Sequence, residues 1–432
     1  MTDTDIQPFT ISVPDSELSD LKTRLSLARF PDEIEGAEWD YGAPLADVKR
    51  LTGHWKDKYD WRAAESKLNA LPQYTTEIRC DGFPETLRIH FIHSKSSRKN
   101  AIPLLFVHGW PGSFIEATKI WKDLSCPSTG TSTSSGGTAG GVSDDEDDAP
   151  AFHFVAPSLP NYGFSDGVKA KGFGISQYAE TCHKLMLRLG YGEYVTQGGD
   201  WGYYITRAMS LLYPEHCKAT HVNMDQGNAP GWTSHPSLAL QHAVTPYTDA
   251  DKKGMARTKW FTEQGSGYRA LQSTKPQTLG YAVADSPVAL LAWIYEKLHD
   301  WTDSYPWTED EVCTWVSIYW FSTAGPAANM RIYYEATHAW GDSSSKVTRQ
   351  GLVGYIGGGV KLGLSHSPKE LRVLPSSWTR TQGDVVFERT HDGGGHFFAW
   401  EKPRHLIEDV RDMFSRKGGG AYGVVKGLDG YD

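Results

Sequence analysis

Residues 198–202 (GGDWG) place one acidic side chain, Asp200, between small residues. An apolar segment at 194–197 precedes them and predicts a strand, and an amphipathic helix is predicted to begin at about Tyr203. A strand, a tight glycine-flanked turn and a helix in direct succession form a nucleophile elbow, which raises its central side chain above the edge of a sheet. The pattern therefore predicts that Asp200 is a nucleophile.

An aspartate at this position changes the chemistry of the elbow. An aspartate side chain is normally ionised at neutral pH and can attack a strained or activated carbon to form an alkyl ester, whereas a serine needs a base. A competing pattern, residues 163–167 (GFSDG), would make the protein a serine esterase through Ser165. Two prolines separate Ser165 from the preceding predicted strand and no helix follows it directly, so we interpret it as a loop residue.

An ester on Asp200 needs a base that activates water, and His396 is the candidate among 16 histidines. It follows a glycine run, residues 393–395, between the last predicted strand and the C-terminal helix. This is the place from which such a fold supplies its catalytic histidine. His391 is close in the sequence, but it lies within or beside that strand, before the glycine run.

The histidine in turn needs a carboxylate that orients it and stabilises its cation. In folds that carry such an elbow, the acid follows the penultimate strand of the sheet, and Glu370 occupies that place in the sequence. Asp384 and Asp392 are the alternatives. Asp384 opens the last predicted strand and Asp392 abuts the glycine run, so both are less favourably placed.

Residues 108–111 (HGWP) directly follow a continuous apolar run at 103–107, which predicts a strand buried on both faces. The loop after such a strand supplies one N–H of an oxyanion hole. We predict that the backbone amides of Trp110 and Trp201 are the two donors. The His108 side chain is expected to brace the loop and to take no part in the chemistry.

The order of the predicted elements indicates how these residues come together. Strands and helices alternate from about residue 100, which predicts a doubly wound, mostly parallel sheet and, with the elbow, an α/β-hydrolase fold. An aromatic-rich helical stretch interrupts the alternation, as an inserted lid would. The expected parts are an N-terminal module packed on the sheet (1–95), a first core segment (96–229) containing a disordered low-complexity insertion (126–150), a helical lid (230–335) and a second core segment (336–432).

The composition limits the partners and the location of the protein. The net charge is -9, with five acidic residues in one run at 144–148, and no basic stripe indicates a nucleic-acid partner. The five cysteines are scattered and form no CxxC, so neither a disulfide framework nor a zinc site is indicated. No apolar run reaches the roughly 20 residues of a membrane span, and no signal peptide is evident, so we expect a cytoplasmic protein without a membrane anchor.

Together these segments resemble the microsomal-type epoxide hydrolases, and most of all the soluble fungal members, over nearly the whole chain outside 126–150. The sequences HGWPGSF, GGDWG and GGHFFAWEKP resemble the oxyanion, nucleophile and histidine segments of that family. Residues 28–32 (ARFPD) and 59–62 (YDWR) resemble parts of the module that precedes its hydrolase domain.

The resemblance implies two lid tyrosines that donate to an epoxide oxygen, at Tyr268 and Tyr333, with the neighbouring Tyr334 as an alternative to Tyr333. Ring opening develops an alkoxide, which a phenol hydroxyl can stabilise or protonate. The implied reaction converts a small-molecule epoxide and water into a vicinal diol, with no metal or organic cofactor. The family also suggests a homodimer.

Two other functions fit part of the pattern. A haloalkane or haloacid dehalogenase shares the aspartate nucleophile, and Trp201 could serve there as a halide donor; the lid tyrosines argue against it, because a halide needs no proton. A non-catalytic binding protein on this fold would have no need of Asp200, His396 and Glu370 together. The aromatic-rich lid favours apolar aryl or alkyl epoxides, with detoxification and a biosynthetic step both open.

Overall fold

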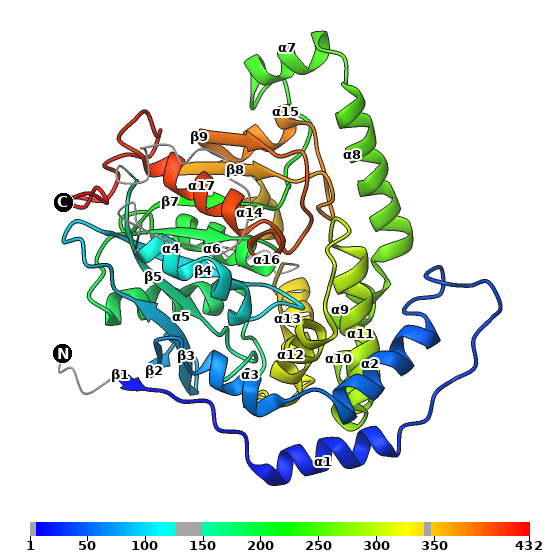
Figure 1. The fold of residues 1–432 in the computed structure, drawn as a ribbon. Helices are drawn as coiled ribbons and strands as arrows, with labels where there is room; N and C mark the ends of the chain where they lie inside the picture. Colours follow the sequence, from blue (N-terminus) through cyan, green and yellow to red (C-terminus); the bar gives the residue numbers. More distant parts are fainter. Residues whose placement is uncertain (1–5, 127–148, 341–346) are drawn as a thin grey trace, which may run out of the picture.

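The computed structural model describes residues 6–126, 149–340 and 347–432, and a nine-stranded sheet runs through this part of the chain (Figure 1). The strand order is β1-β2-β3-β5-β4-β6-β7-β8-β9, and neighbouring strands from β5 to β9 are parallel. The predicted mostly parallel sheet is therefore present. Its strands are β1 (Ile6–Pro8), β2 (Gln73–Arg79), β3 (Thr86–Ser94), β4 (Ile102–Val107), β5 (Phe152–Pro157), β6 (Tyr194–Gly198), β7 (Cys217–Val222), β8 (Ile356–His366) and β9 (Gly383–Thr390).

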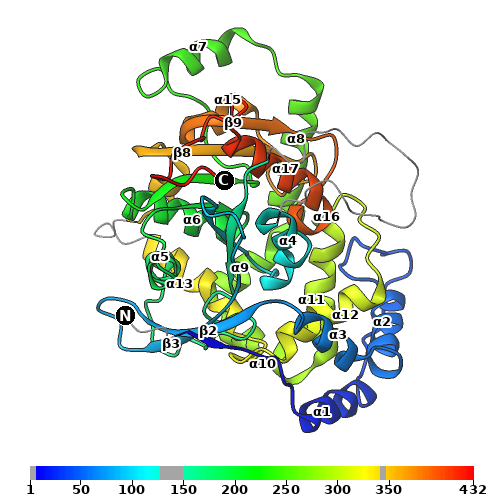
Figure 2. The same cartoon turned by 60° about the vertical axis from the view of Figure 1, so that its left-hand side comes forward.

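The central strands β4 and β6 are buried along their whole length. The continuous apolar sequence of β4 predicts this burial, whereas β6 (YVTQG) is buried although it contains Thr196 and Gln197. Helices α5 (Ile175–Arg188) and α6 (Trp201–Leu212) cover one face of the sheet. Helices α4 (Trp121–Ser125), α16 (Phe398–Glu401) and α17 (Pro403–Phe414) cover the other face (Figure 2). Both faces of the central strands are thus shielded from water, and their carboxyl ends meet at one edge.

The N-terminal module contributes to two parts of the molecule. Its hairpin, β2 and β3, extends the same sheet in antiparallel fashion together with β1. Helices α1 (Asp15–Ser26), α2 (Leu45–Asp57) and α3 (Trp61–Leu68) pack instead against the helical insertion. One tie is a hydrogen bond of 3.0 Å from the indole N–H of Trp55 to Ser317 Oγ. The module therefore braces the insertion against the sheet.

Helices fill the chain between β7 and β8, where the lid was expected (Figure 1). They bring aromatic side chains over the carboxyl edge of the sheet, and the exact limits of the lid stay a prediction. The described helices are α7 (Pro236–Val244), α8 (Asp249–Trp260), the π-helix η4 (Phe261–Gly265), α9 (Gly267–Thr274), α10 (Pro276–Asp285), α11 (Pro287–Asp300), α12 (Glu309–Trp320), η5 (Ala328–Met330), α13 (Arg331–Trp340) and α14 (Arg349–Val353).

Strand β7 has no counterpart among the elements that the sequence predicts. Its sequence, CKATHV, mixes polar and apolar residues although most of the strand is buried. Two of its polar side chains form hydrogen bonds across the sheet: Thr220 shares one of 2.9 Å with Thr196, and His221 one of 2.9 Å with Ser365. Polar side chains can be buried in a central strand when they are hydrogen-bonded to each other. Because such residues interrupt the apolar sequence by which a central strand is normally recognised, β7 could not be predicted.

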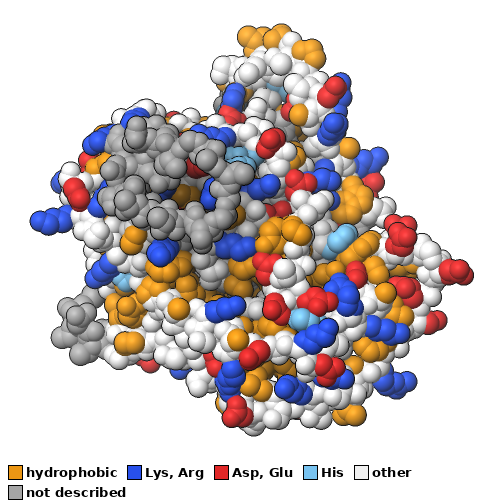
Figure 3. Space-filling model, viewed as in Figure 1, with side chains coloured by type: hydrophobic (Ala, Val, Ile, Leu, Met, Phe, Trp, Pro, Cys, Tyr) orange, Lys and Arg blue, Asp and Glu red, His pale blue; other side chains and the backbone are white. Residues whose placement is uncertain are grey.

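The sequence also raises expectations about the low-complexity insertion, membrane spans and surface charge. Most of the low-complexity insertion, residues 127–148, lies outside the described residues. None of the described helices is both long enough and apolar enough to cross a membrane. On the face shown in Figure 3, acidic and basic side chains of the described residues are interspersed, and apolar side chains reach the surface at the tip near α7.

The end of β8 is fixed by a buried ionic cluster around His366. Its Nδ1 lies 2.6 Å from Asp225 Oδ1, and its Nε2 lies 3.1 Å from Glu388 Oε1. Burial lowers the pKa of His366, but Asp225 and Glu388 outweigh this effect and raise the pKa to about 10. The imidazolium therefore holds the end of β8 against the end of β7 and against β9.

Replacing this imidazolium should make stability less dependent on pH. Because the folded pKa lies above the unfolded one, the cluster contributes fully below about pH 6.5 and loses its contribution as pH rises through about 10. His366→Gln should lower the free energy of unfolding by about 3 kcal/mol at pH 6. Denaturant titrations should show that difference shrinking towards pH 10.5; a difference that stays constant across this range would contradict the assignment.

Candidate active site

The predicted elbow is present between β6 and α6, with Asp200 at its apex. Asp200 has a φ of 50°, a left-handed conformation that a non-glycine residue adopts only under strain. The flanking glycines are required by close approach: a Cβ on Gly198 would lie 2.6 Å from the Gly202 backbone, and one on Gly202 would lie 1.9 Å from the carbonyl oxygen of Val107. The turn can therefore fit beneath the end of β4 only with glycine at both positions.

The loop after β4 wraps around the Asp200 carboxylate. The Trp110 backbone N–H donates a hydrogen bond of 2.7 Å to Asp200 Oδ1. Gly109 makes this approach possible, because a Cβ there would lie 2.2 Å from the same oxygen. Trp201 is the first residue of α6, so its N–H belongs to the positively polarised N-terminal turn of a helix. These are the two amides predicted for the oxyanion hole.

His396 lies between two carboxylates. Its Nε2 is 3.4 Å from Asp200 Oδ2, and its Nδ1 is 2.6 Å from Glu370 Oε1. The glycine run brings the two loops together, since the Lys369 N–H donates to the carbonyl oxygen of Gly394 at 3.1 Å. The structure thus unites Asp200, His396 and Glu370, which are far apart in the sequence.

The two carboxylates control the charge of His396. Burial lowers its pKa, but Glu370 and Asp200 act more strongly together and raise the pKa to about 10. In the free protein His396 is therefore a cation at neutral pH. Of the alternative acids, Asp384 is engaged elsewhere, in an ion pair of 2.6 Å with Lys361.

His108 and Ser165, for which the sequence predicts no catalytic role, have structural roles. His108 spans its loop, with Nδ1 bonded to the Gly109 carbonyl and Nε2 accepting from the Leu159 N–H at 3.1 Å. Ser165 is fully buried, donates to the Ser158 carbonyl and accepts from the His90 N–H. Its hydroxyl is therefore tied into a loop, away from any elbow geometry.

His391 is also engaged away from the site. Its Nε2 lies 2.7 Å from a carboxylate oxygen of Asp409, which is a fully buried residue of α17 and also pairs with Arg389. This ionic cluster anchors the C-terminal helix to the end of β9. The histidine that reaches Asp200 is therefore His396 and not its neighbour before the glycine run.

Two lid tyrosines surround the Trp110 ring. Tyr268 on α9 stacks against it with ring centroids 5.1 Å apart, and Tyr333 on α13 meets it edge to face at 5.7 Å. Tyr333 also meets the Trp201 ring at 4.8 Å. Burial and then the negative charge of Asp200 raise the pKa of Tyr268, and burial with the same charge also raises that of Tyr333. Both phenols therefore keep their protons at neutral pH.

The structure separates Tyr333 from its neighbour Tyr334. The Tyr333 side chain is 3% exposed, and its hydroxyl is buried beside the side chains of Tyr268 and Trp201. The Tyr334 ring stacks on His338, with centroids 3.9 Å apart, and lines a different, open pocket with Lys169 and Lys275. Only Tyr333 is brought to the aromatic group above Asp200.

One polar residue at the site was missed in the sequence. Glu116, in the 3-10 helix η2 (Phe114–Lys119), lines a small cavity of about 20 Å³ together with Asp200 and His396. Burial raises its pKa to about 8, with Asp200 adding to the effect and His396 opposing it. A single glutamate in the segment FIEA carries no sequence pattern of its own, so only the folded geometry reveals it.

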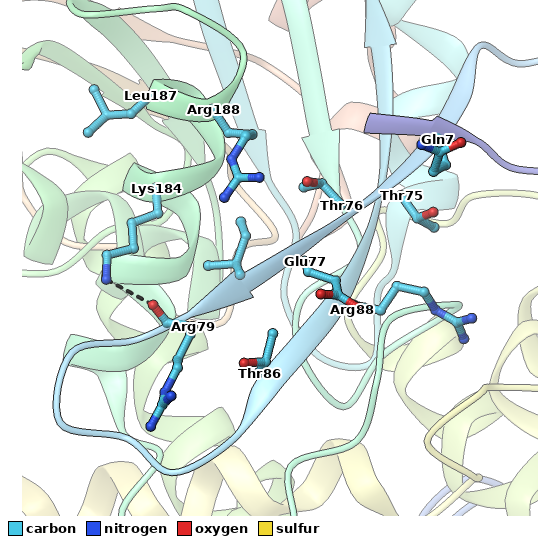
Figure 4. Close-up of a pocket in the computed structure, with 11 residues that line it drawn as sticks. Gln7, Thr75, Thr76, Glu77, Arg79, Thr86, Arg88, Lys184, Leu187 and Arg188 are labelled. Carbon is cyan, nitrogen blue, oxygen red and sulfur yellow. Dashed lines mark hydrogen bonds between the residues drawn. The ribbon is translucent and has the colours of Figure 1, made fainter. Parts of the chain in front are cut away.

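A larger pocket lies elsewhere and lacks catalytic groups. It has a volume of about 750 Å³ and is lined by β2, β3, α5 and Gln7. Figure 4 shows mainly basic and hydroxyl side chains there, with Lys184 bonded to the Arg79 carbonyl. Size alone would choose this pocket, but Asp200 and His396, the predicted nucleophile and base, line the smaller one.

Comparisons with known families and proteins agree with this geometry. A family model described as the epoxide hydrolase N terminus matches residues 6–117, and one described as the alpha/beta hydrolase fold matches residues 102–245. A putative epoxide hydrolase of Stigmatella aurantiaca is 38% identical, covering 95% of this chain and 84% of the relative. Epoxide hydrolase 1 of Oryctolagus cuniculus is 33% identical, covering 95% and 89%.

Solved structures give the same result. The epoxide hydrolase of Aspergillus niger superimposes with a TM-score of 0.76 at 35% identity and covers 94% of each chain. The juvenile hormone epoxide hydrolase of Bombyx mori gives a TM-score of 0.77 at 29% identity, covering 94% of this chain and 93% of the other. The predicted α/β-hydrolase fold and the family resemblance of the sequence motifs are both confirmed.

A single methyl group at position 109 should disable the site. In Gly109→Ala the new Cβ meets both Oδ1 and the Cβ of Asp200, so the Asp200 side chain must move. We expect turnover to fall by at least about 100-fold, because small misplacements of reacting groups have large effects, and the free energy of unfolding to fall by about 1–3 kcal/mol.

The matched control is Gly53→Ala on α2, where a Cβ meets no atom within 4 Å. It should leave turnover unchanged and stabilise the helix by up to about 1 kcal/mol. Steady-state kinetics and denaturant titration measure both quantities. Wild-type turnover in Gly109→Ala would show that the Asp200 position is not critical.

Proposed function

Because this chain belongs to the epoxide hydrolase family and is an enzyme of that class, we propose that it forms a vicinal diol through an alkyl ester on Asp200. The observation that carries the proposal is the pairing of the Asp200 carboxylate. One oxygen accepts from the Trp110 N–H at 2.7 Å, and the other faces His396, which is in turn paired with Glu370. A carboxylate held in this way can act as nucleophile and later as ester.

In the first half-reaction, Asp200 Oδ2 forms a bond to one epoxide carbon while that carbon's bond to the ring oxygen breaks. The ring oxygen takes a proton from a phenol, Tyr268 or Tyr333. The buried hydroxyl of Tyr333 suits this task, because a developing alkoxide is a stronger base than a phenolate. The raised pKa of both phenols keeps the proton in place until the alkoxide forms.

The ester changes the charge of His396. Forming it removes the negative charge of Asp200, which is one of the two charges that hold the His396 pKa at about 10. The imidazolium then releases its proton more readily, and that proton restores the phenol of Tyr268 or Tyr333 that protonated the alkoxide. The neutral imidazole, oriented by Glu370 through its Nδ1, becomes the base for the second half-reaction.

In the second half-reaction, water adds to the Asp200 Cγ and gives a proton to His396 Nε2. The resulting oxyanion is stabilised by the amides of Trp110 and Trp201. When the tetrahedral intermediate collapses, the diol oxygen leaves with the proton from His396. The Asp200 acid then transfers its own proton to His396, which restores the ion pair of the free enzyme.

The aromatic side chains of the lid argue against a dehalogenase and indicate the class of epoxide that the site accepts. A dehalogenase would share Asp200, but it would have no use for two buried phenols beside the nucleophile. The group around the site is formed by the rings of Trp110, Tyr268, Trp301 and Tyr333. Such a lining favours apolar aryl or alkyl epoxides. A homodimer and a cytoplasmic location also remain part of the proposal.

Removing both phenol hydroxyls should abolish epoxide turnover. The Tyr268→Phe, Tyr333→Phe double variant should lose at least about 1000-fold in kcat/KM, because the alkoxide is left without an acid. Tyr334→Phe is the matched control and should retain wild-type activity, since its ring stacks on His338. Assays with a panel of aryl and alkyl epoxides test both, and an active double variant would remove these tyrosines from the mechanism.

Replacing the base should separate the two half-reactions. In His396→Gln the attack by Asp200 needs no base, so the ester should form, but its hydrolysis should slow by about 100- to 10,000-fold. Intact-protein mass spectrometry after mixing with epoxide should show the mass of one substrate added, located on the peptide that contains Asp200. Slow turnover of His396→Gln with no detectable adduct would count against the covalent route.

A further inference from the structure

Glu116 stands out because its carboxyl group is buried against the catalytic loop. The side chain is 9% exposed, and a Cβ on Gly112 would lie 1.7 Å from its Oε1. The missing side chain at Gly112 thus makes room for the Glu116 carboxyl. Glycine at 109 does the same for Asp200, so one loop places two carboxyl groups at the two sides of one small space.

The space between them is a cavity of about 20 Å³. That volume suits a single water molecule, which needs at least about 10–15 Å³ and two or more polar partners. The titratable side chains that line the cavity are those of His108, Glu116, Asp200 and His396, and His108 is already bonded within its loop. Glu116, Asp200 and His396 therefore remain to contact such a water, and the Glu116 carboxyl also accepts hydrogen bonds from the backbone N–H groups of Ser113 and Gly109.

We propose that Glu116 is a further catalytic residue, whose carboxyl group and His396 Nε2 together hold the water that hydrolyses the ester on Asp200. This role rests on the proposed ester mechanism. The water donates one O–H to a Glu116 oxygen and the other to His396 Nε2. With both hydrogens directed in this way, a lone pair of the water oxygen can face the Asp200 Cγ.

The bonds change only at Asp200 and His396. The water oxygen bonds to Cγ, one water proton passes to His396 Nε2, and the other O–H remains bonded to Glu116 until the intermediate collapses. The diol oxygen then leaves with the proton from His396. Glu116 is neither protonated nor deprotonated overall, so its role is to fix the attacking water.

The surroundings of Glu116 keep its carboxyl group suited to this role. Burial and Asp200 raise its pKa to about 8, so the group is mostly neutral at pH 7 and adds no further negative charge beside the oxyanion. Its carbonyl oxygen still accepts a hydrogen bond. The titratable groups that surround it or share its helix are Asp200 on the elbow, His396 on its loop, Tyr319 on α12, Glu401 on α16 and, on η2 itself, Lys119, which is paired with Glu311.

The test measures the two half-reactions separately in single turnovers with the full-length protein in excess over a styrene-type aryl epoxide. In Glu116→Ala, ester formation should stay within about threefold of wild type, whereas ester hydrolysis should slow by about 30-fold or more. Glu116→Gln presents a carbonyl of the same size, so hydrolysis should recover to within about fivefold of wild type. Glu116→Asp withdraws the carboxyl and should resemble Glu116→Ala, which keeps the test decisive if the alanine variant does not fold.

Glu401→Gln is the matched control. Glu401 is half-buried near His396, and desolvation raises its pKa to about 7, but its carboxylate accepts from the Asp303 N–H at 2.8 Å and does not line the cavity. It should leave the ratio of the two rate constants unchanged.

Three results would overturn the proposal or its premise. Equal losses in both half-reactions of the Glu116 variants would assign Glu116 a purely structural role. Unchanged hydrolysis in Glu116→Ala or Glu116→Asp would show that the water is held without it. If wild-type protein turned over the epoxide without forming any ester, the ester mechanism itself would fail, and this outcome is distinct from the other two.

Discussion

The whole site depends on the position of one carboxylate on a strained turn. Asp200 adopts a φ of 50°, which costs on the order of 1–3 kcal/mol and must be enforced by its surroundings. Gly198 and Gly202 allow the turn to press against β4, and the Trp110 amide holds one oxygen of the carboxylate. The sheet, the loop after β4 and the start of α6 therefore act as a single support for one side chain.

The second constraint is electrostatic, and it connects parts of the chain that are far apart in sequence. His396 is a cation between Asp200 and Glu370 in the free enzyme, and in the proposed mechanism it serves as a base once an ester has removed the charge of Asp200. In that mechanism the charges of Asp200 and His396 therefore set the order of the two half-reactions. The buried His366 cluster supports this arrangement, because it fixes the end of β8 a few residues before Glu370.

Residues with a local sequence signature were predictable, and those defined by three-dimensional proximity were not. The elbow, the HGWP loop and the glycine run before His396 each combine a strand end with characteristic small residues, and the structure brings all three together. Strand β7 was missed because its polar side chains bond to one another inside the sheet. The lid tyrosines were identified only through family resemblance, and Glu116 only through the fold, since a lone glutamate has no periodicity or motif to reveal it.

The most direct measurement of the covalent route is a single turnover in water labelled with oxygen-18, with enzyme in excess over epoxide. If Asp200 forms the ester and water attacks its Cγ, the label enters the Asp200 carboxylate, and the first diol carries no label. Mass spectrometry of the peptide that contains Asp200 should show one added oxygen-18 after one turnover. Label found in the first diol and absent from Asp200 would mean that water attacks the epoxide directly, and Asp200 would then not be the nucleophile.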